Sequence, residues 1–98
     1  MPVVLIHQGP TLTQESYGEV VRGLTDGQKD RMGSPSDWPV EGLLVHAAGE
    51  GPSGFRVVDV WESEEACNRF GEALAPHLEA AGITEQPEIY PAHAFVSA

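Results

Sequence analysis

Apolar and polar positions along the chain follow two patterns, one typical of strands and one typical of helices. Residues 2–7 (PVVLIH) are apolar at nearly every position, which predicts a strand that is covered on both faces. Residues 41–48 (EGLLVHAA) and 54–61 (GFRVVDVW) predict two more strands, joined by a glycine-rich turn into a hairpin. A fourth strand is predicted over 87–96 (PEIYPAHAFV). Pro91 cannot donate to a strand ladder and therefore favours a sheet edge or a bulge.

Two other stretches carry apolar residues at the spacing of a helix. Thr11 or Thr13 can cap the first of them, and Thr11 with Gln14 fits a capping box. Ser63 can cap the second, which is predicted over 64–81. Pro76 lacks an N–H, so a kink or a restart of this helix is predicted near Ala75. The apolar stripes are Tyr17, Val20, Val21 and Leu24 in the first helix, and Ala66, Cys67, Phe70, Leu74, Leu78 and Ala81 in the second.

The order of the elements is strand, helix, strand, strand, helix, strand, which is the ferredoxin-like α+β pattern. The chain has 98 residues, enough for one domain, so residues 1–98 are predicted to fold as a four-stranded antiparallel sheet with two helices on one face. Neighbouring strand residues such as Val3 and Val4 are both apolar, so the face without helices is apolar too. Because such a face would not stay in water, we expect a homodimer with the two sheets packed together as a dimeric α/β barrel.

Charge and cysteine content exclude several classes of protein. The chain carries 15 acidic and 5 basic residues, a net charge of -10, which repels nucleic acid and anionic membranes. The first residues have neither the basic region nor the long apolar run of a signal peptide or a membrane span. A single cysteine, Cys67, leaves no internal disulfide and no CxxC motif. We therefore expect an acidic cytoplasmic protein.

The hairpin predicts which polar side chains share a face. If Gly49 pairs with Gly54, then His46 lies opposite Val57 and diagonally beside Asp59, roughly 7–8 Å away at the backbone. An acid in the middle of an apolar strand needs a partner, and an imidazole oriented by a carboxylate is a common general base. His46 and Asp59 are therefore the candidate catalytic pair, and a purely structural hydrogen bond is the alternative. A slip of one residue would send His46 to the other face.

Five residues are candidates for substrate binding, each with a structural alternative. Trp61 ends a strand just before a helix, where it either walls a cavity of roughly 300 Å³ or more or anchors the core. Phe55 shares its face. Trp38, in a polar loop, either covers the pocket or packs. Tyr17 could bind a ligand through its hydroxyl, although it falls in a core stripe, and His93, flanked by alanines, borders a cavity or satisfies the core.

The other histidines give no metal site. His7 ends the first strand and His77 lies on the second helix, so both are predicted to be peripheral. No HxH or HxxxH pair occurs, and a metal site is not expected.

The whole chain resembles the dimeric α/β barrel superfamily, and most closely the small actinobacterial proteins grouped with antibiotic-biosynthesis monooxygenases. The resemblance is carried by VDVWESEEACNRF (58–70) and LEAAGI (78–83), and by the strand segments LLVHAAG (43–49) and YPAHAFV (90–96). It implies a pocket between helices and sheet for an aromatic or polyketide-like compound. It further implies an enzyme that uses neither metal nor flavin, either a monooxygenase or an isomerase or cyclase. A dimer of the same fold that binds a small molecule or a partner without catalysis is the alternative.

The chain departs from the family at positions that matter for activity. The quinone-forming oxygenases carry an Asn four residues before the tryptophan that corresponds to Trp61 and a Tyr six residues after it, where this chain has Val57 and Cys67. The haem-degrading branch needs a Trp and a His on the second helix, where this chain has Phe70 and an unsuitably spaced His77. These departures favour the non-catalytic alternative over a true oxygenase, whereas an acid–histidine contact facing a pocket would favour an enzyme.

Overall fold

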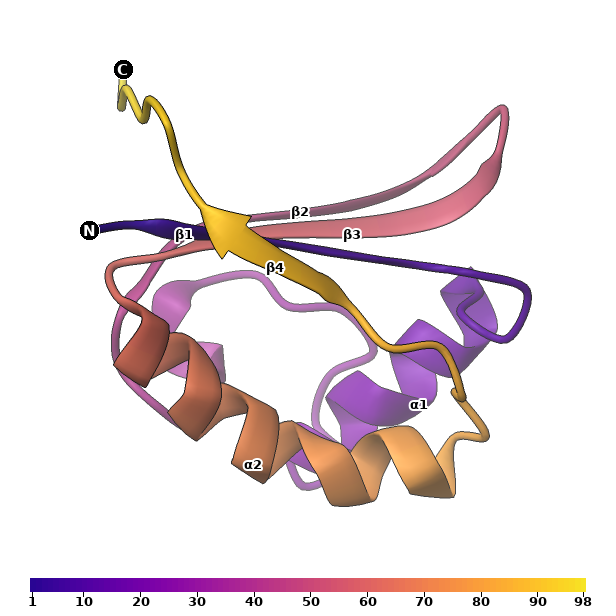
Figure 1. Ribbon diagram of the computed structural model, residues 1–98. Coiled ribbons are helices and arrows are strands. Elements are labelled where there is room, and N and C mark those ends of the chain that lie inside the picture. Colours follow the sequence, from indigo (N-terminus) through magenta and orange to yellow (C-terminus); the bar gives the residue numbers. More distant parts are fainter.

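Four antiparallel strands form one sheet in the order β2-β3-β1-β4, and both helices cover the same face of it (Figure 1). The computed structural model describes all residues from 1 to 98. The predicted ferredoxin-like α+β fold is thereby confirmed. The elements are β1 (Val3–Gln8), α1 (Gln14–Leu24), the 3₁₀ turn η1 (Pro35–Asp37), β2 (Leu43–Gly51), β3 (Gly54–Trp61), α2 (Glu64–Ala80) and β4 (Glu88–Pro91).

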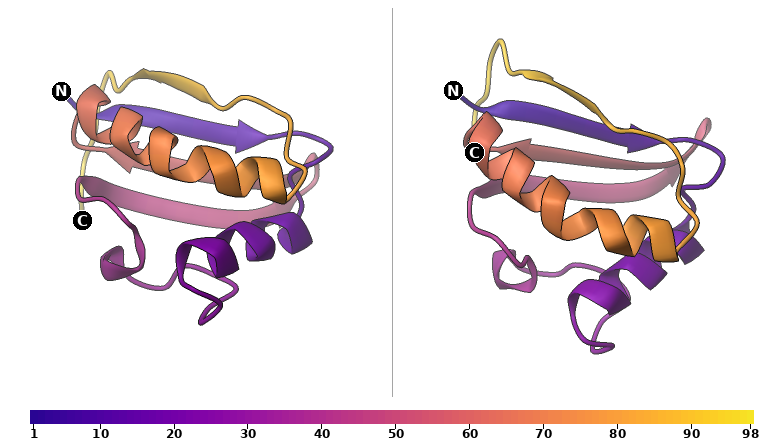
Figure 2. Two further views of the ribbon diagram at one scale, coloured as in Figure 1. Left: turned by 90° about the horizontal axis from the view of Figure 1, so that it is seen from below. Right: turned by 60° about the horizontal axis from the view of Figure 1, so that its bottom comes forward.

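The sheet and the helices form two layers. Seen from the helix side, α2 crosses in front of the middle of the sheet and α1 lies beside it, near β2 (Figure 2). No other element covers the opposite face, and the segment after β4 leaves the sheet on that side (Figure 1). Neither helix is long and apolar enough to cross a membrane.

The hairpin between β2 and β3 is tighter than the sequence predicted. Gly51 pairs with Gly54, so the turn has two residues instead of four, and His46 lies directly opposite Asp59 instead of opposite Val57. The pattern alone could not fix this register, because the glycine-rich segment before the turn continues the ladder as readily as it ends it. The error is two residues, and a shift of two returns every side chain to the same face.

Three other predicted details can be compared with the structure, and the first of them needs correction. β4 ends at Pro91 and not at 96, although the Ala92 N–H still donates to the Pro2 backbone oxygen at 2.9 Å. The N–H that Pro91 lacks would lie on the open side of this strand, and its predicted edge position is confirmed. α2 runs through Pro76 without a break, so no restart of the helix is needed there. The cap of α1 is Thr13, which forms a capping box with Ser16, while Thr11 is engaged with the α2–β4 loop instead.

The core lies between the sheet and the helices in two clusters of buried residues. The first surrounds Trp61, which is fully buried beneath the first turns of α2, and the second lies near the turn end of the sheet, around Phe55. Ser63 fixes the start of α2 over this core by accepting a hydrogen bond from the Ala66 N–H at 3.1 Å. The junction of β3 and α2 is thus fully buried at Trp61 and Ala66.

Candidate active site

A small cavity of about 50 Å³ lies between the two helices and the sheet. Most of its lining is aliphatic, from α1, α2 and the strands below them. Four polar side chains interrupt this lining: His7, Tyr17, His46 and Asp59. A polar group in an apolar enclosure must have a partner or a use, so these four residues define the candidate site.

His46 and Asp59 form a close contact across the β2–β3 pair. The distance from His46 Nδ1 to Asp59 Oδ1 is 2.6 Å, and the two side chains are 12% and 3% exposed. The contact follows from the register, which places the two residues opposite each other on the helix-covered face. The contact that the sequence predicted is present; its role in catalysis stays a prediction.

Tyr17, one of the predicted binding residues, bonds the other nitrogen of the same ring. Its hydroxyl lies 2.8 Å from His46 Nε2 and 3.4 Å from the backbone N of Met32. A carboxylate can only accept, so Nδ1–H of a neutral imidazole donates to Asp59 and Nε2 is left to accept. The Tyr17 O–H then donates to Nε2, and its oxygen accepts from the Met32 N–H. Every donor in this chain of hydrogen bonds has one acceptor.

The surroundings keep the Tyr17 hydroxyl protonated. Burial raises the pKa of Tyr17 above its ordinary value of 10.0; the Met32 N–H opposes this rise and the Asp59 charge adds to it. The sequence pattern placed Tyr17 in the apolar stripe of α1, which is correct, but could not show that its polar end reaches His46 on another element.

Two aromatic rings fix the orientation of the imidazole. Trp38 meets His46 edge-on, with ring centroids 4.7 Å apart and planes at 70°. The Tyr17 ring lies 5.9 Å away on another side, with its plane only 12° from that of His46. Phe55 packs against Tyr17 at 5.4 Å but does not line the cavity. Trp38 thus lines the cavity and packs on His46 itself, whereas Phe55 packs on Tyr17 outside the cavity lining.

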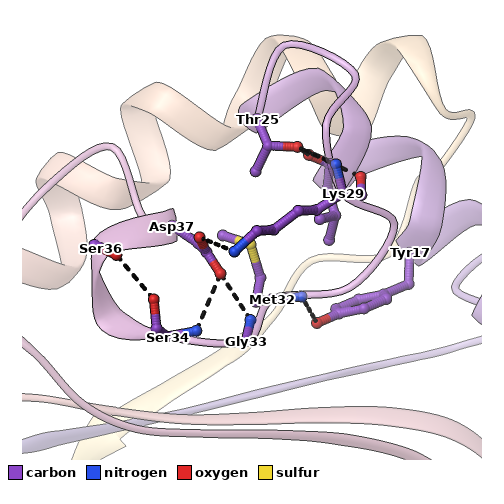
Figure 3. A network of polar contacts seen from close by, with 9 residues as sticks. Tyr17, Thr25, Lys29, Met32, Gly33, Ser34, Ser36 and Asp37 are labelled. Atoms are coloured by element: carbon purple, nitrogen blue, oxygen red, sulfur yellow. Dashed lines mark hydrogen bonds and ion pairs between the residues drawn. The ribbon is translucent and has the colours of Figure 1, made fainter.

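The loop between α1 and β2 carries Trp38 and Met32, and a polar network holds it in place (Figure 3). Lys29 Nζ contacts Asp37 Oδ1 at 2.6 Å, and Asp37 Oδ2 accepts from the N–H groups of Gly33 and Ser34 at 2.8 and 3.0 Å. The hydrogen bond from Lys29, followed by the one from Gly33, lowers the pKa of Asp37 from 3.8 to about 2. The carboxylate is therefore charged at neutral pH, and the loop stays tethered.

His7 was predicted to be peripheral, and this prediction is wrong. The residue is only 4% exposed, lines the cavity, and contacts the backbone oxygen of Glu85 through Nε2 at 2.8 Å. Side chains alternate along β1, so His7 points to the same side as the buried Val3 and Leu5. That alternation was the available signal; the continuous apolar run of the strand obscured it.

Trp61 is a core anchor and does not wall the cavity. It is fully buried and stacks on Phe70 with ring centroids 4.9 Å apart, and Phe70 is the ring that lines the cavity. Of the two alternatives for Trp61 the core anchor is the correct one, and no pocket of 300 Å³ or more lies beside it because α2 packs directly onto the strand end. Trp61 Nε1 is buried without a hydrogen-bond partner.

The other candidates lie away from the cavity. His93 is exposed, since β4 ends two residues before it, and it borders no part of the site. Cys67 is buried, and burial raises the pKa of its thiol, so it is not a reactive nucleophile. No three His, Cys, Asp or Glu side chains come together in a group that could hold a metal ion.

Fold and site together define a ferredoxin-like α+β protein with a histidine-lined apolar cavity. No protein-family model matches the chain, and a search of curated proteins finds no match. Among solved structures, the chain is similar to a monooxygenase from the gene ActVA-Orf6 of Streptomyces coelicolor, crystallised in complex with the ligand nanaomycin D. The identity is 22%, the match covers 99% of this chain and 91% of that chain, and the TM-score is 0.46.

Proposed function

We propose that this chain is a cofactor-free enzyme that binds a small aromatic or polyketide-like compound and takes a proton from it with His46. The observation that carries the proposal is the chain of hydrogen bonds from Tyr17 through His46 to Asp59, built into the wall of an otherwise apolar cavity. Both nitrogens of a buried imidazole need a partner in any role, and what points to a base is that the second partner is a hydroxyl that a ligand group can replace. Here both ring nitrogens are engaged, and Nε2 is kept as an acceptor beside the cavity.

The proton transfer follows from this arrangement. An acidic O–H or C–H of the ligand takes the place of the Tyr17 O–H at His46 Nε2 and gives up its proton, while Asp59 stabilises the imidazolium that forms. Return of the proton to another carbon of the ligand anion is an isomerisation and needs no further reactant. Attack of the same anion on O₂ would give a hydroperoxide, and loss of water from it would leave a carbonyl; in this monooxygenase form the ligand itself supplies the two electrons that reduce the second oxygen to water. The departures at Val57 and Cys67 favour the isomerase or cyclase form.

A ligand of this size requires the loop to move. The cavity of about 50 Å³ has room for roughly three or four water molecules, whereas pockets for drug-sized ligands hold roughly 300–1,000 Å³. Tyr17, Met32 and His46 also line a groove on the outer surface, so they separate the cavity from solvent. We place the access route there, with Met32 and Trp38 displaced together with their loop.

A second candidate is a small-molecule-binding protein without catalysis. The departures at Val57 and Cys67 favour it over a true oxygenase, because two polar groups that the quinone-forming oxygenases carry are missing. Both candidates bind a ligand beside His46, and they differ in whether a proton moves.

Hydrogen exchange separates the two candidates. In D₂O, the wild-type protein should accelerate the loss of the ring C–H signals of 1,3-dihydroxynaphthalene, followed by proton NMR. His46→Gln should slow the protein-dependent rate about 100-fold or more, because a positioned general base contributes roughly 10²–10⁴. His93→Gln is the matched control, an exposed histidine outside the cavity, and should leave the rate unchanged. Binding without any acceleration would establish the second candidate instead.

We further propose that a second copy of the chain covers the bare face of the sheet. Val58 and Val60 point to this face, since Asp59 between them points to the cavity, and they are only half-buried. Val45 on β2 and Tyr90 on β4 are 40% and 45% exposed, and Val4 on β1 lies between Val60 and Tyr90 on the same face. Contiguous apolar residues across four strands are typical of an interface.

Light scattering tests the dimer. The wild type should scatter as twice the 10.5 kDa chain mass, and Val58→Lys should give monomer or aggregate because it buries a charge between the sheets. Asn68→Lys makes the same charge change on the exposed side of α2 and should remain a dimer. A stable wild-type species of 10.5 kDa would refute the proposal.

A further inference from the structure

His7 is the one polar side chain of the cavity that the proposed proton transfer does not use. It is nine-tenths buried, and its Nε2 lies 2.8 Å from the backbone oxygen of Glu85. A carbonyl oxygen can only accept, so Nε2 carries the proton of the neutral ring and Nδ1 is left with a lone pair. The Glu85 segment is itself held in place, because its carboxylate accepts from the backbone N–H of Thr11 at 3.2 Å and from the Thr11 hydroxyl.

The Nδ1 atom of His7 has no protein partner. Trp61 Nε1 is the only unpartnered polar side-chain atom that is completely sealed, so His7 Nδ1 keeps some accessible surface within a residue that is 4% exposed. The ring lines the cavity. The tautomer of His7 is fixed by Glu85, and its Nδ1 is a buried acceptor without a partner. This nitrogen can therefore accept a hydrogen bond from a donor group of a ligand in the cavity.

The sheet sets the distance between the two histidines. His46 pairs with Asp59 and His7 pairs with Val57, so the histidines lie on either side of β3 and two residues apart along it. Two strand spacings of about 4.8 Å and two residues of about 3.3 Å put their Cα atoms about 12 Å apart. His46 and His7 therefore mark two separate ends of one apolar cavity.

We propose that His7 Nδ1 is a specificity-determining acceptor for an O–H or N–H group on the end of the ligand remote from His46. This inference rests on the proposed function and names its substrate class. The ligand is a flat fused-ring compound with one ionisable group at the His46 end and a hydrogen-bond donor at the other end. A compound with a single polar group leaves one of the two histidines without a partner, at a cost to affinity.

A pair of probes and two variants test the role of His7. Isothermal titration should show that the wild type binds 1,5-dihydroxynaphthalene about tenfold more tightly than 1-naphthol, as expected for one added hydrogen bond. His7→Gln retains an N–H in place of Nε2 for Glu85 but loses the Nδ1 acceptor, so the preference should fall to about twofold or less while 1-naphthol binding is kept. His7→Asn places an amide oxygen near the Nδ1 position and should restore most of the preference. Amide NMR spectra of both variants verify that they are folded.

The outcomes distinguish this inference from the proposed function. Equal binding of the two probes by the wild type, or an undiminished preference in His7→Gln, would overturn the role of His7 and leave His46-dependent hydrogen exchange unaffected. If the wild type does not accelerate hydrogen exchange but shows a probe preference that depends on His7, His7 is supported as a ligand contact and catalysis by His46 is refuted. Failure of the wild type to bind either naphthol would overturn both.

Discussion

Trp61→Ala should lower the free energy of unfolding by about 3–5 kcal/mol, the range expected when a large aromatic side chain is removed from a core. The side chain is fully buried, and it stacks on Phe70 at the junction where β3 passes into α2. Its Nε1 has no hydrogen-bond partner, so the loss is one of packing alone. Urea denaturation at a fixed protein concentration measures the change.

Trp38→Ala is the matched control for this prediction. It removes the same side chain from a half-buried position in the α1–β2 loop, so it should cost less than half as much. It should instead weaken ligand binding, since Trp38 packs on His46 and Trp61 does not line the cavity. A Trp61→Ala protein within about 1 kcal/mol of wild type would mean that α2 does not depend on this anchor.

His46→Leu should cost a similar amount, about 3–5 kcal/mol, for a different reason. It leaves the Asp59 carboxylate, 3% exposed, without the partner 2.6 Å away, and an unpaired buried charge is strongly destabilising. The double variant His46→Leu, Asp59→Leu should recover most of that loss, because replacing a whole buried pair by apolar groups is often nearly neutral. Denaturant unfolding of wild type, both single variants and the double variant at pH 7 completes the cycle.

One result of this double-mutant cycle would contradict the coupling of His46 and Asp59. If the double variant loses as much as the two single variants added together, the side chains are not coupled, and the assignment of Asp59 as the orienting partner of His46 fails. Tyr17→Phe serves as the control within the same site, since it removes only the hydrogen bond to Nε2 and leaves the carboxylate paired.

The sequence was sufficient to predict the fold because its main signals are local. Apolar runs and helical stripes gave the correct order of strands and helices, and Ser63 correctly marked the start of α2. The shared face of His46 and Asp59 was also predicted correctly, even though the register was wrong by two residues. Parity along a strand is a more robust property of the sequence than register, since only an odd shift changes it.

The parts that the sequence could not predict depend on contacts between distant segments. Tyr17 and His46 are 29 residues apart and meet because α1 packs over β2. The burial of His7 depends on the α2–β4 loop, whose Glu85 backbone oxygen lies 78 residues away. The volume of the cavity depends on how closely α2 approaches the sheet, which is set by the packing of Trp61 and Phe70 and not by any one segment.

The two-residue turn of the β2–β3 hairpin has a consequence for how such a chain can vary in length. His46 and Asp59 are the two polar residues of the site on this hairpin. The bulge of β2 at Leu43 and Val45 lies outside the segment 46–59 that joins them. Insertions or deletions of two residues on this segment can slip the pairing and still leave the histidine and the acid on one face. A change of one residue keeps them on one face only where the turn takes up that residue or a new bulge absorbs it. Related chains that keep this site should therefore carry any odd change in hairpin length in the turn or at a bulge.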